Sequence, residues 1–174
     1  MHPHLKVYSY KYLLMAAQRA HLRASEAKDT LFDCMEVMLF SALSLEAFLN
    51  HLGPQLFQPW AVLKKKLSPR EKLDVMLGAR GKTVDFSRRP YQSFNEAFQL
   101  RNALAHAETD YVPFEGASPH NLPMSDWMKM CDLKNAKRTL EDAEAIQRKL
   151  PVLLGVTEDI PDFLLAETVA RPTK

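Results

Sequence analysis

The sequence predicts an all-α protein, a helical bundle of four to five main helices within a single domain over residues 1–174. Three observations predict this fold class. Apolar residues return every three to four positions over most of the chain, which is the period of an amphipathic helix. Five glycines are too few for a β-rich fold that needs many tight turns. The chain also lacks internal repeats and low-complexity segments.

The core of this domain is expected over about residues 5–153, with a short C-terminal helix and tail over 154–174. The first helix is expected over residues 5–24, where apolar or aromatic residues recur with helical spacing. A chain of this length has room to bury a sizeable core in one domain.

The second helix is expected to begin at Asp29 or Thr30, either of which can cap it, and to run to about Leu52. Gly53-Pro54 is expected to end it. Its surface is apolar nearly all round, which predicts the most buried position in the bundle.

The third predicted helix has a strong start signal in its first four residues, Ser68-Pro69-Arg70-Glu71. Ser68 suits the N-cap, Pro69 the first helical position and Glu71 the third, where its side chain can complete a capping box. Glycines near residues 78–81 are expected to end this helix.

Pro90 opens the next predicted helix, which runs through His106. Residues 109–133 contain three prolines and a glycine, and they are expected to form a long loop of the kind that is often functional. A short C-terminal helix is expected over residues 160–169. The pattern predicts no sheet.

The last long helix is expected to start at Asp132 or Leu133 and to reach about Leu150. Pro151 and Gly155 would stop it, because proline lacks the amide hydrogen of a continuing helix and glycine favours a C-terminal cap.

The net charge of +2 conceals a strongly basic segment. Between residues 64 and 89, nine basic and three acidic residues give a charge of +6, whereas residues 29–63 and 91–133 each carry −4. Such a band is a candidate footprint for phosphate groups. A solvated face joined to a linker explains it equally well.

Cysteine content and hydropathy set the expected compartment. Cys34 and Cys131 stand far apart without CxxC spacing, which favours a reducing cytoplasm. The N-terminus resembles no signal peptide, and the apolar stretch from Val37 to Leu49 is too short to span a membrane. No set of residues has metal-ligand spacing, so neither a metal nor another cofactor is expected.

The most informative segment lies at the end of the helix that Pro90 opens. On a straight helix Arg101 falls within about 60° of Phe94 and Phe98, so its guanidinium points along an apolar stripe. Burial of a guanidinium is unfavourable unless it meets a partner, which suggests an anion, a carboxylate or a second subunit. A second, polar stripe lies beside it: Asn95, Gln99, Asn102 and His106.

Arg101-Asn102-Ala103-Leu104-Ala105-His106 resembles the Arg-polar-x3-His motif of the HEPN superfamily of small all-α proteins. The setting is similar too, since Glu46 and Asn50 lie on a long central helix that precedes the motif. The resemblance covers about residues 5–153.

The resemblance implies a metal-independent endoribonuclease of toxin–antitoxin or antiviral defence systems, with an active site formed where two motifs meet in a homodimer. It implies that Arg101 holds the phosphate, that His106 transfers a proton, and that Asn102 orients the imidazole of His106 or donates to the phosphate. RNA would be the substrate and an antitoxin protein a partner. Some members carry a tyrosine two residues after the histidine that is modified by their antitoxin, and Glu108 stands at that position here.

Lys64, Lys65, Lys66, Arg88 and Arg89 are the candidates for contacts with the RNA backbone. Residues five apart point about 140° from each other on an ideal helix, so Arg101 and His106 cannot face one phosphate from a straight helix. A swung arginine, a loosened helix end or two subunits would resolve this.

Each candidate residue also has a purely structural interpretation. Arg101 can form an ion pair with Glu46, His106 can sit favourably at a helix C-terminus, and Asn102 can be an exposed polar residue. For Glu46 and Asn50, an internal polar network is favoured over catalysis. The alternative function is accordingly a non-catalytic HEPN-like module that binds a nucleotide, RNA or a partner protein.

Overall fold

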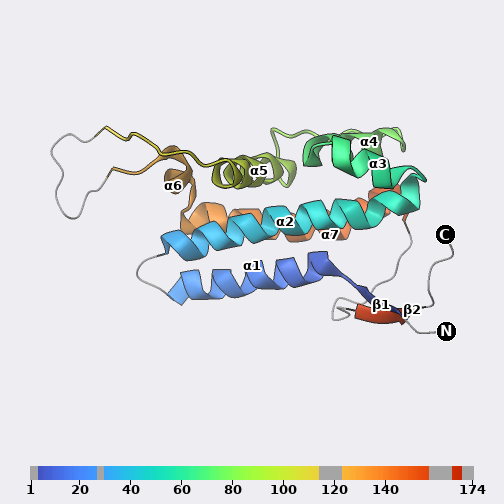
Figure 1. Cartoon of the computed structure of the whole chain (residues 1–174), viewed down its shortest axis with the longest axis horizontal. Coiled ribbons are helices and arrows are strands. Elements are labelled where there is room, and N and C mark those ends of the chain that lie inside the picture. Colours follow the sequence, from blue (N-terminus) through green and yellow to red (C-terminus); the bar gives the residue numbers. More distant parts are fainter. Residues whose placement is uncertain (1–3, 27–29, 114–122, 157–165, 170–174) are drawn as a thin grey trace.

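The computed structural model describes residues 4–26, 30–113, 123–156 and 166–169. In this described part the chain forms seven helices and two short strands, so the all-α fold class is confirmed (Figure 1). No helix in these ranges is long and apolar enough to cross a membrane.

Three long helices form the centre of the bundle: α1 (Ser9–Glu26), α2 (Leu31–Leu56) and α7 (Leu133–Leu154). In Figure 1, α2 crosses the middle of the molecule with α1 below it and α7 behind it. The shorter helices α3 (Trp60–Lys66), α4 (Pro69–Gly78) and α5 (Tyr91–Ala105) lie above α2 in the same view.

Helix α2 has the central position that its sequence predicts. No residue from Asp33 to Gly53 is fully exposed. This burial follows from packing on three sides, because α1, α5 and α7 all contact α2.

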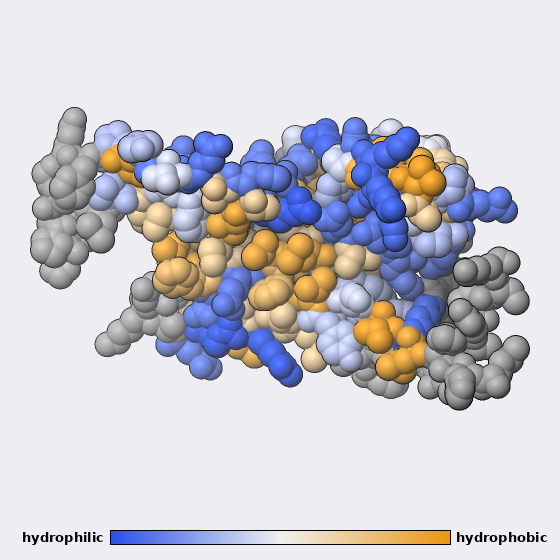
Figure 2. Space-filling view, viewed as in Figure 1, coloured by the Kyte–Doolittle hydropathy of each residue, from blue (hydrophilic) through white to orange (hydrophobic). Residues whose placement is uncertain are grey.

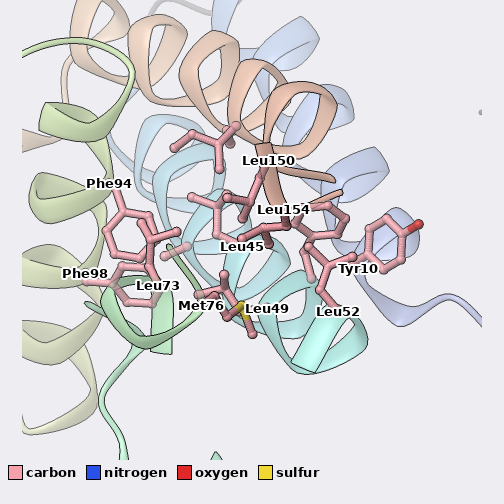
Figure 3. Close-up of a cluster of buried hydrophobic side chains, with 14 of the residues drawn as sticks. Tyr10, Leu45, Leu49, Leu52, Leu73, Met76, Phe94, Phe98, Leu150 and Leu154 are labelled. Carbon is pink, nitrogen blue, oxygen red and sulfur yellow. The ribbon is translucent and has the colours of Figure 1, made fainter. Parts of the chain in front are cut away.

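The larger core joins helices that are distant in sequence. Figure 3 shows side chains of α2, α4, α5 and α7 meeting in one cluster. Leu45 of α2 lies in it with Leu73 of α4 and Phe94 and Phe98 of α5. The polar neighbours Glu46 and Lys72, adjacent in sequence to Leu45 and Leu73, are thereby brought to the same place.

Helix α2 does not end at Gly53-Pro54, contrary to the expectation, but continues to Leu56. The indole of Trp60 packs directly on Gly53, and a Cβ atom at Gly53 would lie 2.0 Å from the ring. Gly53 therefore serves a close approach rather than a helix end. The cap Thr30 makes no side-chain cap hydrogen bond, and Asp29, the other expected cap, lies outside the described residues.

The start of α4 is as the sequence predicts. Ser68 Oγ accepts a hydrogen bond from the Glu71 backbone N–H at 3.3 Å, and Glu71 Oε2 accepts one from the Ser68 N–H at 2.7 Å. The helix ends at Gly78. The short helix α3 before it was not expected, since seven residues carry too little periodicity to reveal one.

Both chain ends differ from the expectation of a purely helical protein. Strand β1 (His4–Val7) pairs antiparallel with β2 (Ala166–Val169), so the first helix begins at Ser9 and residues 166–169 are not helical. The remainder of the expected C-terminal helix, residues 160–165, lies outside the described residues. Each of these four-residue strands forms its ladder hydrogen bonds with the other, which is distant in sequence. Neither segment therefore carries a local sequence signal that predicts a strand.

The expected loop over 109–133 contains one short helix, α6 (Asp126–Met130), while residues 114–122 lie outside the described residues. Asp132 caps α7 and accepts a hydrogen bond from the backbone N–H of Asn135 at 2.7 Å. Helix α7 passes through Pro151 and ends at Gly155, whose φ of 62° is left-handed. The expected stop at Pro151 is therefore wrong by about one turn, whereas the expected cap at Gly155 is confirmed.

Candidate functional site

Helix α5 carries Arg101 along the stripe that the sequence predicts. Phe94 and Phe98 are buried, and Arg101 follows in the next turn with 29% of its side chain exposed. His106 is the C-cap residue, and its backbone N–H donates to the Asn102 carbonyl at 3.0 Å. The motif thus spans the last turn of α5 and its end.

The guanidinium of Arg101 has two partners. Its Nη2 donates to Glu46 Oε2 at 3.0 Å, and its Nη1 donates to Asn102 Oδ1 at 2.9 Å. The structural alternative for Arg101, an ion pair with Glu46, is therefore present. Asn102 helps to orient the arginine while remaining an exposed residue.

Lys72 of α4 joins the same carboxylate, a contact that the sequence analysis missed. Its Nζ donates to Glu46 Oε1 at 3.0 Å, and only 2% of the lysine side chain is exposed. The signal was that Lys72 lies on the buried face of α4 with Leu73 and Met76. A buried lysine needs a partner, and Glu46 supplies it.

The resulting cluster, Lys72–Glu46–Arg101, carries two positive charges and one negative charge. Arginine has five N–H donors, and the bonds to Glu46 and Asn102 use two of them. Within the part of the chain that the structure describes, no residue accepts from the other three. The guanidinium of Arg101, which is partly exposed and lies in a net positive cluster, is therefore a suitable anchor for an anion.

Asn50 lies one turn after Glu46 on α2. Its Oδ1 atom is buried and receives no hydrogen bond from the described residues. The expected polar network therefore includes Glu46 with Lys72 and Arg101, whereas no described bond joins Asn50 to it.

His106 does not join the cluster. Its side chain is exposed, and in the described part of the chain no hydrogen bond connects it to Arg101. Arg101 is thus held within the cluster, whereas His106 lies at the end of the helix, exposed and outside the cluster.

The candidate backbone-binding residues fall into two groups. Lys64, Lys65 and Lys66 are exposed in the last turn of α3, and Arg88 is exposed with its Nε 3.3 Å from an Asp85 oxygen. In Figure 2 hydrophilic surface gathers around α3 and α4.

Arg89 is instead committed to α7. Its Nε lies 2.9 Å from both oxygens of Asp142, and its Nη2 lies 3.0 Å from Glu141. The hydrogen bonds to Asp142, and then to Glu141, raise the pKa of Arg89 above its ordinary value. Its charge is thus already neutralised within the chain, which weakens its candidacy for RNA.

The described residues hold no group of three or more histidine, cysteine, aspartate or glutamate side chains placed to bind a metal ion. Cys34 and Cys131 are free and buried. Burial raises the pKa of both thiols, that of Cys131 to about 11, so neither is an effective nucleophile near neutral pH.

In comparisons with known proteins, the chain matches no family model, no curated protein and no solved structure.

Proposed function

We propose that this protein is a HEPN-like endoribonuclease that cleaves RNA without a divalent metal, at a composite site completed by a second copy of the chain. The observation that carries the proposal is the state of Arg101. Glu46 and Asn102 orient its guanidinium, which stays partly exposed with donors available to a phosphate.

In this reaction the ribose 2′-oxygen attacks the adjacent phosphorus atom and the bond from phosphorus to the 5′-oxygen breaks. His106 takes the proton of the 2′-hydroxyl as the general base. The imidazolium of His106 then gives this proton to the departing 5′-oxygen. Arg101 stabilises the negative charge on the phosphate oxygens. The products are a cyclic phosphate and a 5′-hydroxyl.

Two copies resolve the geometry. Because Arg101 faces Glu46 while His106 projects into solvent, a phosphate held by one chain's arginine needs a histidine from elsewhere. A two-fold arrangement with the motif helices near the axis supplies the histidine of the second copy.

The basic residues on one side of the molecule suit the RNA path. Lys64, Lys65, Lys66 and Arg88 are exposed and would contact successive phosphates, so binding should weaken as salt rises. The same proposal includes a cytoplasmic location and an antitoxin protein that restrains the nuclease.

The test incubates purified protein with total cellular RNA in the presence of a chelator. Wild type should cleave, and His106→Ala should lose at least about 100-fold in rate, the usual contribution of a general acid or base. His106→Ala should stay folded, because the side chain is exposed.

Gln99→Ala is the matched control, since Gln99 is also exposed on the same helix. It should cleave at the wild-type rate. If wild type and His106→Ala leave identical RNA, with or without added metal, the non-catalytic module that binds RNA or a nucleotide through Arg101 replaces the nuclease.

A further inference from the structure

Six residues form an outward stripe on α2. On a helix that turns 100° per residue they fall within about 80° of one another, and none of them is buried. They lie between the sides of α2 that face α1 and α5: Phe32, Glu36, Leu39, Leu43, Glu46 and Asn50.

In the centre of the stripe, the same residue types stand at equal distances on either side of Ser41. Counted from Ser41, leucines stand two positions away on each side, at Leu39 and Leu43, and glutamates stand five positions away, at Glu36 and Glu46. Phe32 and Asn50 each stand nine positions from Ser41, so their positions are also symmetric, but their side chains differ in chemistry.

The two glutamates also have equivalent partners. Glu36 forms an ion pair with Arg23 of α1, and Glu46 forms one with Arg101 of α5. Each end of the stripe thus presents a carboxylate with an arginine from a neighbouring helix.

Between these ends the stripe is apolar and accessible. Leu39 and Leu43, which lie between the glutamates, are half-buried, and Phe32, which lies beyond Glu36, is 65% exposed. Figure 2 shows apolar surface in the middle of the face where α2 passes, with hydrophilic surface toward its margins. An apolar patch with a polar rim is the usual composition of a protein interface.

We infer that a second copy of this chain docks antiparallel on this stripe, with the two-fold axis passing near Ser41. A two-fold interface uses the same patch on both chains and must complement itself, which the repeat about Ser41 satisfies. Leu39 packs against the partner's Leu43. At each end the Glu36–Arg23 pair of one chain comes beside the Glu46–Arg101 pair of the other, so the rim of the interface carries both signs of charge.

The proposed nuclease site needs a second chain, and this interface says where that chain binds. In assigning it this role, the inference rests on the proposed function. Glu46 lies five residues from the axis, or about 7.5 Å along the helix. Both copies of the Lys72–Glu46–Arg101 cluster therefore border one interface.

The first test is the mass in solution at micromolar concentration, measured by sedimentation equilibrium. Wild type should have the mass of two 19.9 kDa chains. Leu39→Glu and Leu43→Glu should sediment as single chains, because each places two charges in the apolar centre. Val152→Glu, at a position 79% exposed on α7, should remain a dimer. A monomeric wild type, or dimeric leucine variants, would overturn the inference.

The second test fixes the register and does not depend on variants that carry a charge. Leu39→Cys and Leu43→Cys proteins are mixed and treated with a short thiol-to-thiol cross-linker; the native Cys34 and Cys131 are buried. The mixture should give cross-linked dimers in several-fold excess over either variant alone. Equal yields, or none, would contradict antiparallel packing about Ser41.

The outcomes separate the two proposals. A dimer with the expected cross-link that leaves RNA intact supports the interface and refutes the nuclease. A single chain that cleaves RNA refutes the interface and the composite site, and keeps only the metal-independent chemistry.

Discussion

Two arginines lie near opposite ends of α5, and their surroundings differ. Arg89, before the helix, faces two carboxylates, Asp142 and Glu141, so its cluster is net negative. Arg101, in the last turn, shares the single carboxylate of Glu46 with Lys72, so its cluster is net positive.

The difference shows that the surroundings of an arginine, rather than its presence, decide what it can bind. Arg89 is saturated, and Asp142 is buried with a further hydrogen bond from Ser93 Oγ at 2.6 Å. Arg101 has N–H donors that no described residue accepts from, and it lies in a net positive cluster that attracts anions. The first cluster fastens α5 to α7, and the second holds α4 and α5 to α2 at the candidate site.

The largest expected effect on stability is at Glu46. Glu46→Ala leaves the ammonium of Lys72 buried without its partner, which should lower the free energy of unfolding by about 3 kcal/mol. Urea denaturation followed by circular dichroism measures it.

Glu141→Ala is the control in the Arg89 cluster. Glu141 is 50% exposed, so its loss should change stability by no more than about 0.5 kcal/mol. Adding Lys72→Met to Glu46→Ala should restore much of the loss, because the unpaired charge is then gone. If Glu46→Ala and Glu141→Ala lowered the free energy of unfolding equally, the two clusters would not differ in their contribution to stability.

Asp142→Ala should have the next largest effect, about 2 kcal/mol in the free energy of unfolding. Ser93 loses its acceptor, but the half-exposed Arg89 can return to water, so the loss is smaller than at Glu46. Asp142→Asn keeps an acceptor for Ser93 and should lose less. The same urea measurement checks the order, and an Asp142→Ala loss above that of Glu46→Ala would reverse the comparison.

The two arginines should differ in their effect on RNA affinity. Arg101→Ala should weaken binding about 10-fold at moderate salt and lower the salt slope by about one, as loss of one phosphate contact does. Arg89→Ala should leave affinity within about two-fold, because its charge is already neutralised. Fluorescence anisotropy over a salt series distinguishes the two, and equal weakening would show that Arg89 also reaches the RNA.

The smallest expected effect is acid sensitivity at the start of α4, the helix that carries Lys72. Hydrogen bonds from Ser68 hold the pKa of Glu71 below its ordinary value. The folded state therefore gains stability from this carboxylate above its unfolded pKa of 4.5, and loses it as the pH falls through the lower folded pKa. An NMR titration of Glu71 checks the direction, and Glu71→Gln should abolish the dependence. A midpoint at or above the ordinary value would contradict the capping box.

The sequence predicted the elements whose signals are local. The capping box at Ser68 and Glu71, the cap at Asp132 and the burial of α2 all depend on residues within a few positions of one another. The apolar stripe that includes Arg101 likewise follows from the spacing of residues along one helix.

The sequence failed where a distant element overrode a local signal. Gly53-Pro54 has the composition of a helix end, yet α2 continues to Leu56, and Gly53 instead gives room to the indole of Trp60 from the next helix. Strands β1 and β2 pair across most of the chain, and neither was expected.

At the candidate site, the sequence by itself determined that Arg101 lies on the buried stripe of a helix, because the helical period fixes that direction. Only the tertiary structure decided the charges around it. Glu46 stands 55 residues before Arg101 and 26 before Lys72, while Asp142 stands 53 residues after Arg89. No local rule joins such residues. Packing of α2, α4, α5 and α7 on a shared apolar core brings them together, and so decides that Arg89 is neutralised and that Arg101 stays open to an anion.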